Sequence, residues 1–265
     1  MLLVPGYDYL EVTTPLPKVL LVRFNRPAVL NAVNTAMGRE LLALFTEVNA
    51  APVGEIACVV LTGSGERAFC VGGDLKERNG MTTEQWQAQR VIFKQYNLAM
   101  ERCPVPVMCA VNGLALGGGA EMILRTDFSY AADHAKFGFP EIKRGFMPGS
   151  GGTQRFPRIV GEARAKEFLL TGENFCAADA LAWGVVNKVL SASEVLPACL
   201  ATAEKLSHCP SDAVRTAKLC IHYGLQADIE TGLVIEALGQ QRLAASPDRL
   251  EGIAAFVEKR APNFK

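Results

Sequence analysis

Two carboxylic acids in apolar, glycine-rich surroundings are the residues of this chain best suited to acid–base chemistry. Glu121 lies in the segment GGGAEMIL, and Glu141 follows the segment FGFP. A carboxyl group in apolar surroundings has a raised pKa, which suits general acid or base work near neutral pH. Two such groups could share one water molecule. The pattern alone leaves open that each is an ordinary acid near a helix start or a structural, hydrogen-bonded acid.

Two glycine-rich loops offer a second kind of chemistry. Residues 69–76 read FCVGGDLK, and residues 112–121 read NGLALGGGAE. Glycine lets backbone N–H groups approach a ligand closely, and at a helix start these groups align with the positive end of the dipole. Two such groups aimed at one oxygen form an oxyanion hole, worth roughly 3–4 kcal/mol per donor in the transition state. Spacing alone equally allows glycines that serve only tight turns and close packing. Neither loop matches a P-loop or a dinucleotide-binding motif.

A third glycine-rich loop, PGSGGTQR, covers residues 148–155. Ser150 and Thr153 are suitable helix caps, and Arg155 suits an interface or a structural ion pair. A nucleophilic Ser150 is unsupported, because the surroundings do not read G-x-S-x-G and no histidine is placed nearby as a base.

Composition narrows the class of protein. The chain has 265 residues, 49% of them hydrophobic, which suits one large domain or one domain with a small appendage. Lys plus Arg equals Asp plus Glu at 27 each, so nucleic-acid binding is not expected and a defined oligomer is reasonable. Eight cysteines without a C-x-x-C pair and three histidines make a metal site unlikely. The N-terminal segment resembles no signal or transit peptide, and no apolar run could span a bilayer, so a cytoplasmic location is expected.

Hydrophobic patterning predicts an α/β core followed by a helical tail. Buried strands are expected at 19–24, 56–62, 105–111, 128–131 and 135–139, with a weak strand signal in 185–190. Helices are expected from the Asn34 cap to about residue 48, from residue 117, and at 161–170, 178–183, 194–207, 211–224, 227–244 and 247–258. We expect a core of residues 1–200 and a C-terminal helical segment of residues 201–265.

Five segments together resemble the crotonase (enoyl-CoA hydratase/isomerase) superfamily. They read RPAVLNA, FCVGGDLKE, AVNGLALGGGAE, FGFPEIKRGFMPGSGGTQRFPRIVG and DRLEGIAAFVEKRAPNFK. The whole chain is most similar to bacterial short-chain enoyl-CoA hydratases and to methylglutaconyl-CoA hydratase-like members. The resemblance implies an α/β, ClpP-like spiral of ββα units with a C-terminal helical segment that trimerises, so that the protein is a homotrimer or a homohexamer.

The resemblance also implies roles for individual residues. The Gly73 and Gly118 amides fall on the family's oxyanion hole, and many relatives have alanine at the first position. Glu121 and Glu141 fall on the two hydratase glutamates. By resemblance, Glu121 is the base toward the water that attacks C3, and Glu141 gives a proton to C2. The implied reaction is syn addition of water across the C2=C3 bond of an α,β-unsaturated acyl-CoA thioester.

Contacts to coenzyme A are implied in the same way. They fall on Ala28, Leu30, Val71, Gly72, Gly73, Asp74, Leu75, Lys76, Leu116, Gly117, Gly118, Pro140, Phe256 and Lys259. Phe256 and Lys259 match a segment that family members donate to a neighbouring subunit. Coenzyme A is part of the substrate, and neither a separate cofactor nor a metal is expected. The pocket wall for the acyl group is expected from residues 77–96 and from Phe139, whose bulk would shorten the tunnel.

Two other kinds of function stay open. One is a different reaction of the same superfamily, such as a Δ3,Δ2-enoyl-CoA isomerase, a thioester hydrolase, a decarboxylase or a dehalogenase. Isomerases commonly keep one acid where this chain has both Glu121 and Glu141, which favours a hydratase. The other is a non-catalytic member that binds coenzyme A or RNA. The neutral net charge disfavours RNA, and the retained acids disfavour a dead enzyme.

Overall fold

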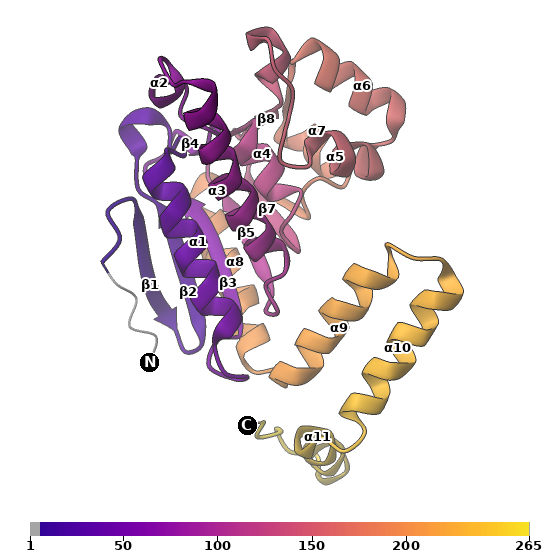
Figure 1. The fold of residues 1–265 in the computed structure, drawn as a ribbon. Helices are drawn as coiled ribbons and strands as arrows, with labels where there is room; N and C mark the ends of the chain where they lie inside the picture. Colours follow the sequence, from indigo (N-terminus) through magenta and orange to yellow (C-terminus); the bar gives the residue numbers. More distant parts are fainter. Residues whose placement is uncertain (1–5, 265) are drawn as a thin grey trace.

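A six-stranded sheet forms the centre of the computed structural model, which describes residues 6–264 (Figure 1). Its strands, in spatial order, are β1 (Leu10–Leu16), β2 (Val19–Phe24), β3 (Cys58–Gly63), β5 (Val107–Val111), β7 (Phe128–Ala132) and β10 (Lys188–Leu190). Only the pairing of β1 with β2 is antiparallel. Strands β3 and β5 are buried along their whole length, which explains their continuous apolar sequences, since parallel strands are covered on both faces.

A second sheet of four short strands lies beside the first. Its strands, in order, are β4 (Ala68–Cys70), β6 (Leu114–Leu116), β8 (Lys136–Gly138) and β9 (Asn174–Cys176). Strand β4 follows β3, β6 follows β5, and β8 follows β7, and a helix comes after each pair. The chain therefore repeats a ββα unit, as the resemblance implies. Strands β4, β6 and β8 run parallel and deliver the chain to loops or helices at the same edge of this sheet, whereas β9 runs antiparallel to β8.

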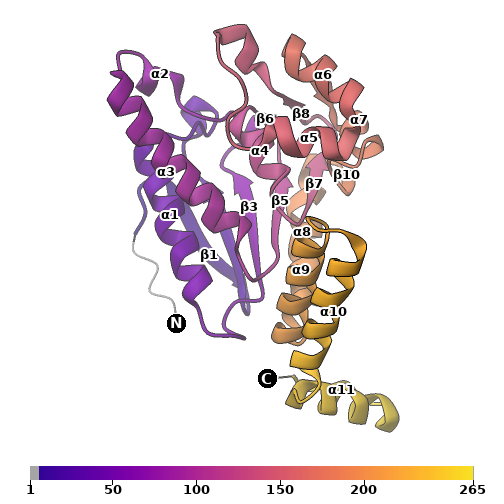
Figure 2. The ribbon, with the colours of Figure 1, turned by 45° about the vertical axis from the view of Figure 1, so that its right-hand side comes forward.

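Helices cover both faces of the large sheet. On one face α1 (Thr35–Ala50) packs against α3 (Thr83–Glu101), while α8 (Ala192–Ser207) covers the other face (Figures 1 and 2). Four short elements follow strands of the two sheets: η1 (Pro27–Val29), α2 (Leu75–Arg78), α4 (Gly118–Ile123) and η2 (Pro140–Arg144). Three more helices surround the end of the second sheet: α5 (Gly152–Val160), α6 (Glu162–Thr171) and α7 (Ala177–Ala182).

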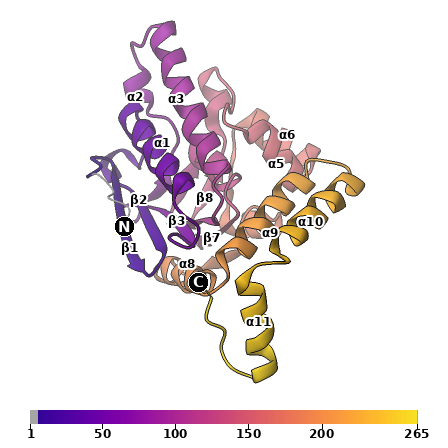
Figure 3. The same cartoon turned by 60° about the horizontal axis from the view of Figure 1, so that its bottom comes forward.

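The C-terminal helices extend away from the sheets. Helices α9 (Ser211–Gly224) and α10 (Ile229–Leu243) form an antiparallel pair, and α11 (Pro247–Glu258) projects beyond them (Figures 2 and 3). The boundary expected at residue 200 falls inside α8. None of the helices within residues 6–264 is long and apolar enough to cross a membrane.

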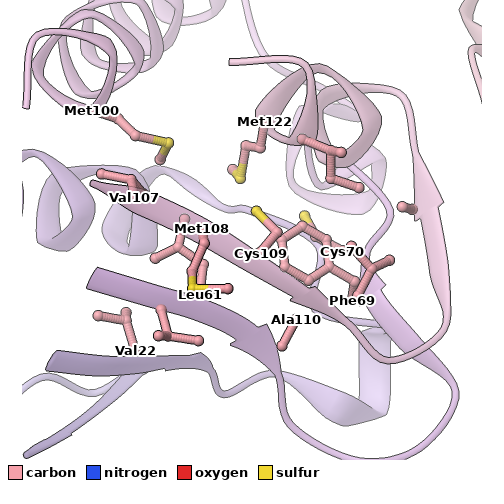
Figure 4. Packing of buried hydrophobic residues seen from close by; sticks show 14 of the residues in the cluster. Val22, Leu61, Phe69, Cys70, Met100, Val107, Met108, Cys109, Ala110 and Met122 are labelled. Atoms are coloured by element: carbon pink, nitrogen blue, oxygen red, sulfur yellow. The ribbon is translucent and has the colours of Figure 1, made fainter. Parts of the chain in front are cut away.

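The main core lies between the large sheet and its helices. Figure 4 shows side chains from β2, β3, β5, α3 and α4 meeting there: Val22, Leu61, Met108, Met100 and Met122 are among them. Five of the eight cysteines are buried, where a free cysteine packs as a small apolar residue. Three of these, Cys58, Cys70 and Cys109, have thiol pKa values raised to about 12 by burial.

Several predicted elements are confirmed, and others were missed or wrongly bounded. Asn34 caps α1 by accepting a hydrogen bond from the Met37 N–H at 2.9 Å. Strands predicted at 56–62 and 105–111 begin two residues later, at Cys58 and Val107. The helix caps proposed for Ser150 and Thr153 are wrong, because Gly151 occupies the cap of α5 without a side-chain bond. Helix α3 and strand β1 were not predicted from the sequence.

Asn31 fixes the turn between β2 and α1. It is fully buried with φ +56°, and its amide nitrogen donates to the carbonyls of Ser64 at 3.0 Å and Ala68 at 2.8 Å. Its Oδ1 accepts from the Arg26 N–H at 3.0 Å. One side chain thus satisfies three backbone groups and ties the η1 turn to the chain between β3 and β4.

We expect Asn31→Ala to lower the free energy of unfolding by about 2–4 kcal/mol, because buried backbone groups lose partners and alanine must adopt a positive φ. Asn34→Ala is the matched control and should cost about 1 kcal/mol, the usual value of a helix cap. Urea denaturation followed by circular dichroism measures both. Equal losses in the two variants would contradict the role assigned to Asn31.

Candidate active site

The two glycine-rich loops touch each other through their backbones. A Cβ on Gly72 would lie 2.8 Å from the Gly118 nitrogen, and a Cβ on Gly118 would lie 3.9 Å from the Gly73 nitrogen. Gly72 and Gly117 have φ values of +85° and +53°, which other residues adopt only with strain. Larger residues would therefore push the loops apart. The contact brings the Gly73 and Gly118 amides into adjacent turns, and both residues are half-buried among more deeply buried neighbours.

The loop after β4 is held by a short strand-like pairing. The Val33 N–H donates to the Gly72 carbonyl at 2.8 Å, and the Asp74 N–H donates to the Val33 carbonyl at 2.9 Å. Gly73 lies opposite Val33 in this pairing, and the residues on either side of it, Gly72 and Asp74, are hydrogen-bonded to Val33. Gly118 is the first residue of α4, where an N–H has no partner within its own helix. The two amides expected from the resemblance therefore lie in loops whose geometry the surrounding backbone fixes.

An ion pair beneath this loop connects it to the η1 turn. Arg26 Nη1 lies 2.8 Å from Asp74 Oδ2 and also donates to the Ala32 carbonyl at 2.6 Å. Asp74 Oδ1 caps α2 by accepting from the Lys76 and Glu77 N–H groups. Burial alone would raise the pKa of Asp74, but the bonds from Arg26 and from the helix start hold it below its ordinary value. The Asp74 side chain is thus engaged in structure.

The carboxylate of Glu121 is hydrogen-bonded to backbone N–H groups at the start of α5. It lies on α4, is 2% exposed, and its Oε1 accepts hydrogen bonds from the Ser150 N–H at 2.7 Å and the Gly152 N–H at 2.8 Å. Burial raises the pKa of this carboxyl, and the two N–H donors oppose the rise by stabilising the ionised form. One carboxylate oxygen is thereby fixed in place, which leaves Oε2 to contact another molecule.

Glu141 is a second buried acid with a different environment. It lies on η2, is 8% exposed, and its Oε2 is buried without a hydrogen-bond partner among residues 6–264. Burial raises the pKa of Glu141 to about 7, and the charge of Glu121 adds to the rise. A Cβ on Gly117 would lie 2.8 Å from Glu141 Oε1, so the carboxyl group packs directly on the second glycine loop. An unpartnered buried carboxyl is costly, and such groups cluster at functional sites.

Arg125 secures the loop that holds Glu121, and no sequence pattern predicted this role. Its guanidinium donates to the Asn97 side chain at 2.5 Å and to the Ser150 carbonyl, and Glu101 lies 3.5 Å from its Nε. Arg155, which was expected to be structural or interfacial, pairs with Glu101 in the same cluster. Nothing in the local sequence links Arg125 to residue 150, because the contacts join the segment just after α4 to α3 and to the loop before α5.

The structure brings most residues expected to contact coenzyme A to one side of the molecule. Ala28 and Leu30 lie on or beside η1, and residues 71–76, 116–118 and Pro140 lie on the loops that follow β4, β6 and β8. Leu75 and Lys76 are exposed, while Val71, Leu116 and Pro140 are half-buried. Phe256 and Lys259 are different: they lie on or just after α11, which is far from α2 in all three views and far from α4 in Figures 1 and 2 (Figures 1, 2 and 3).

Residues expected to shape the acyl tunnel are divided between the core and the surface. Phe139 is fully buried and packs against Phe156 with ring centroids 5.0 Å apart. Phe93 is 8% exposed and packs against Tyr96, whereas Trp86 is exposed and stacks on Arg90. These contacts support a packing role for Phe139 and Phe93.

The repeated ββα units, the paired glycine loops and the two buried acids define a crotonase-type α/β enzyme. A family model described as enoyl-CoA hydratase/isomerase matches residues 17–265. A solved enoyl-CoA hydratase from Bacillus anthracis superposes with a TM-score of 0.94 at 39% identity, covering 97% of this chain and 99% of that one.

Curated relatives agree over nearly the full length. A short-chain-enoyl-CoA hydratase of Clostridium acetobutylicum is 37% identical, covering 92% of each chain. A crotonyl-CoA hydratase of Syntrophomonas wolfei is 37% identical, covering 93% of this chain and 94% of that protein. The chain belongs to the enoyl-CoA hydratase/isomerase family.

The raised pKa of Glu141 predicts a pH-dependent gain in stability for Glu141→Gln. Between its ordinary value of 4.5 and about 7, the folded protein binds more protons at this site than the unfolded chain does. Rising pH therefore destabilises the wild-type fold across this window, and the loss persists above pH 7. The variant should be more stable than wild type at pH 8, by up to about 3 kcal/mol at 1.36 kcal/mol per pKa unit, and nearly equal at pH 5.

Chemical denaturation at the two pH values measures this gain. Glu173→Gln is the matched control, because Glu173 is an exposed acid paired with Lys143. A gain for Glu141→Gln that is the same at pH 5 and pH 8 would refute the assignment.

Proposed function

We propose that the protein hydrates α,β-unsaturated acyl-CoA thioesters by syn addition of water, with Glu121 and Glu141 as the two acid–base groups. The observation that carries the proposal is the pair of buried acids beside the touching glycine loops. One acid is held by two N–H donors, and the other has an unpartnered oxygen and a pKa of about 7. Two acids whose environments differ in this way suit separate base and acid roles.

The Gly73 and Gly118 amides would polarise the substrate first. The thioester carbonyl oxygen becomes enolate-like as water adds to C3, and two N–H donors stabilise that charge by roughly 3–4 kcal/mol each. The donors are backbone groups, so glycine in place of the alanine common in relatives keeps the role. The polarised C2=C3 bond then accepts a nucleophile at C3.

Glu121 and Glu141 would move the two protons. The bonds from Ser150 and Gly152 favour the ionised form of Glu121, which suits a base that takes a proton from the attacking water. With a pKa of about 7, Glu141 is substantially protonated at neutral pH and can give its proton to C2. Water supplies OH to C3 and one net proton to C2, so the product is a 3-hydroxyacyl-CoA and no redox partner is needed.

Substrate contacts would come from the segments already described. We expect the coenzyme A moiety to contact Ala28, Leu30, residues 71–76, residues 116–118 and Pro140. The isomerase alternative needs only one acid to move a proton between C2 and C4. The presence of a second buried acid without a structural partner favours hydration, and it also disfavours a protein that only binds coenzyme A or RNA.

The decisive test is loss of the enoyl-thioester absorbance with crotonyl-CoA. We expect wild type to consume the band, and Glu121→Gln and Glu141→Gln each to lower kcat by about 10²–10⁴, the range of one general acid or base. Glu173→Gln should match wild type, since that acid is exposed and paired with Lys143. The hydratase assignment fails if wild type is inert on crotonyl-CoA and on longer, branched and cyclic enoyl-CoAs, or if it shifts 3-enoyl-CoAs faster than it hydrates 2-enoyl-CoAs.

A homotrimer, in which two trimers can stack into a hexamer, is our proposal for the assembly. Its support is the set of large apolar side chains that α9–α11 leave exposed, since exposed apolar surface of this kind marks protein–protein contacts. The residues are Leu219, Ile221, Leu225, Ile229, Leu233, Val234, Leu238, Leu250, Ile253, Phe256 and Val257. In such an assembly Phe256 and Lys259 would reach the neighbouring subunit's coenzyme A. A cytoplasmic location stays a prediction from the sequence.

Light scattering tests the assembly. We expect the wild-type mass to be three or six times that of the chain, and Leu238→Lys to lower it, because a charge would replace an apolar side chain that is 61% exposed in the single chain. Lys188→Glu, an exposed change on β10, is the control. A monomeric wild type would overturn the proposal.

A further inference from the structure

The two N–H donors that hold Glu121 come from a loop that is mostly glycine. Residues 149–152 read GSGG, and Gly151 has φ +106°, a conformation in which other residues are strained. Such a segment has many accessible conformations, so its N–H groups would not stay directed at one oxygen without further contacts. Ser150 and Gly152 nevertheless both donate to Glu121 Oε1, at 2.7 and 2.8 Å. A contact from outside the loop must therefore fix its backbone.

Arg125 supplies that contact at the other polar group of the same residue. Ser150 donates its N–H to Glu121, and its carbonyl oxygen accepts a hydrogen bond from Arg125 Nη2. A Cβ on Gly151 would lie 3.4 Å from Arg125 Nη2, so the guanidinium packs against the next residue as well. The Ser150 backbone is thus bonded at both its N–H and its carbonyl, and it can rotate only by breaking one of these bonds.

The guanidinium of Arg125 is itself fixed to helix α3. Its Nη1 donates to Asn97 Oδ1 at 2.5 Å, and its Nε lies 3.5 Å from Glu101 Oε2. The side chain of Arg125 is 5% exposed. Arginine presents its N–H groups in a rigid, planar fork, so one side chain joins α3 to the loop at a fixed separation. A lysine carries the same charge but has no fork with which to bridge the two acceptors.

The titratable and charged groups that face Glu121 come from several elements. They are Arg90 and Tyr96 of α3, Glu141 of η2, and Arg125 just after α4. The two arginines lower the pKa of Glu121, in opposition to the burial that raises it. Among the residues that the structure describes, Arg125 is the one of these four that also donates a hydrogen bond to the loop carrying the N–H donors.

Glu101 is shared between two arginines. It contacts Arg125 and Arg155, and His222 of α9 lies 4.0 Å from its Oε1. Within residues 6–264, Arg155 pairs with Glu101 but donates no hydrogen bond to the backbone of residues 148–152. Arg155 is therefore a matched comparison for Arg125, because it places a cation in the same cluster without the bond to the Ser150 carbonyl.

We propose that Arg125 is a positioning residue for the hydration step, and that it acts through Ser150 on Glu121. By fixing the Ser150 backbone it keeps two N–H donors on Glu121 Oε1, and so keeps Oε2 directed toward the attacking water. The proposal rests on the proposed hydratase function, in which Glu121 is the base. The buried guanidinium is engaged by Asn97, Glu101 and Ser150, so its removal should change kcat and leave substrate binding nearly intact.

The first test is the rate of crotonyl-CoA hydration as a function of pH. We expect Arg125→Met to lower kcat by about 10–100-fold, the usual cost of a misplaced catalytic group, and to leave KM within about 3-fold. The acidic limb of the kcat/KM profile should also move to higher pH. The reason is that Glu121 must be ionised to act as the base, and the variant stabilises that form less well. The loss should therefore be larger at pH 6 than at pH 8.

Arg155→Met is the matched control for this measurement. It removes a cation from the same cluster, so we expect kcat within about 3-fold of wild type and an unshifted acidic limb. Arg125→Lys keeps the charge without the fork, and its kcat should stay at least about 5-fold below wild type. Asn97→Ala removes the anchor on α3 and should lower kcat and shift the limb in the same direction as Arg125→Met. This last variant keeps the test decisive if Arg125→Met folds poorly.

Hydrogen exchange gives a readout that needs no turnover. Mass spectrometry of a peptide spanning residues 148–156 follows the amides that donate to Glu121. In Arg125→Met these amides should exchange at least about 10-fold faster than in wild type, because the loop opens more often. Arg155→Met should leave their exchange unchanged.

The outcomes separate this inference from the proposed function. If wild type is inert on crotonyl-CoA and on other enoyl-CoAs, the hydratase proposal fails, and the exchange data alone decide whether Arg125 fixes the loop. If wild type is active, the positioning role is overturned when folded Arg125→Met keeps the wild-type kcat and acidic limb, when KM changes in place of kcat, or when loop exchange is unchanged. The role is also overturned if Arg155→Met reproduces the losses or if Arg125→Lys restores the full kcat.

Discussion

The backbone contact between the two glycine-rich loops is the constraint on which the rest of the structure depends. Gly72 and Gly118 approach so closely that a Cβ on the former would lie 2.8 Å from the nitrogen of the latter. That approach exists because β4 and β6 are neighbouring parallel strands of the small sheet and deliver their loops to the same edge. The ion pair of Arg26 with Asp74 and the pairing of Val33 with the first loop then fix that loop to the η1 turn and to the chain before α1.

The two acids show how one protein can give two buried carboxyl groups different surroundings within a small volume. Glu121 is as deeply buried as any core residue, yet N–H groups at the start of α5 compensate its charge. Glu141 has a buried oxygen without such compensation, and its carboxyl is therefore costly to ionise. The difference does not come from the residue type. It comes from the loop of residues 148–152, which reaches one acid and not the other, and which Arg125 anchors to α3.

Sequence patterning predicted the buried strands β2, β3 and β5 and the C-terminal helices well, because their apolar periodicity is strong. It missed α3, whose many polar residues reflect an exposed face, and β1, whose residues are mostly exposed. Glu121, Glu141 and the glycine loops stood out by composition. Arg125 did not, since nothing in its local sequence points to residue 150; only the tertiary bonds to Asn97 and to the Ser150 carbonyl reveal its position.

The placement of the oxygen-binding donors on the main chain has a consequence for how such a protein can change over time. Every residue except proline keeps its main-chain N–H group when its side chain is replaced, so the donors that would bind the thioester oxygen are retained through most substitutions. Arg78 at the end of α2 packs against Gly73 and contacts Gln89 and Phe93 of α3. Replacements on these two helices can change the side chains beside the loop while the main-chain amides keep their positions, so new selectivities can arise without rebuilding the reaction centre.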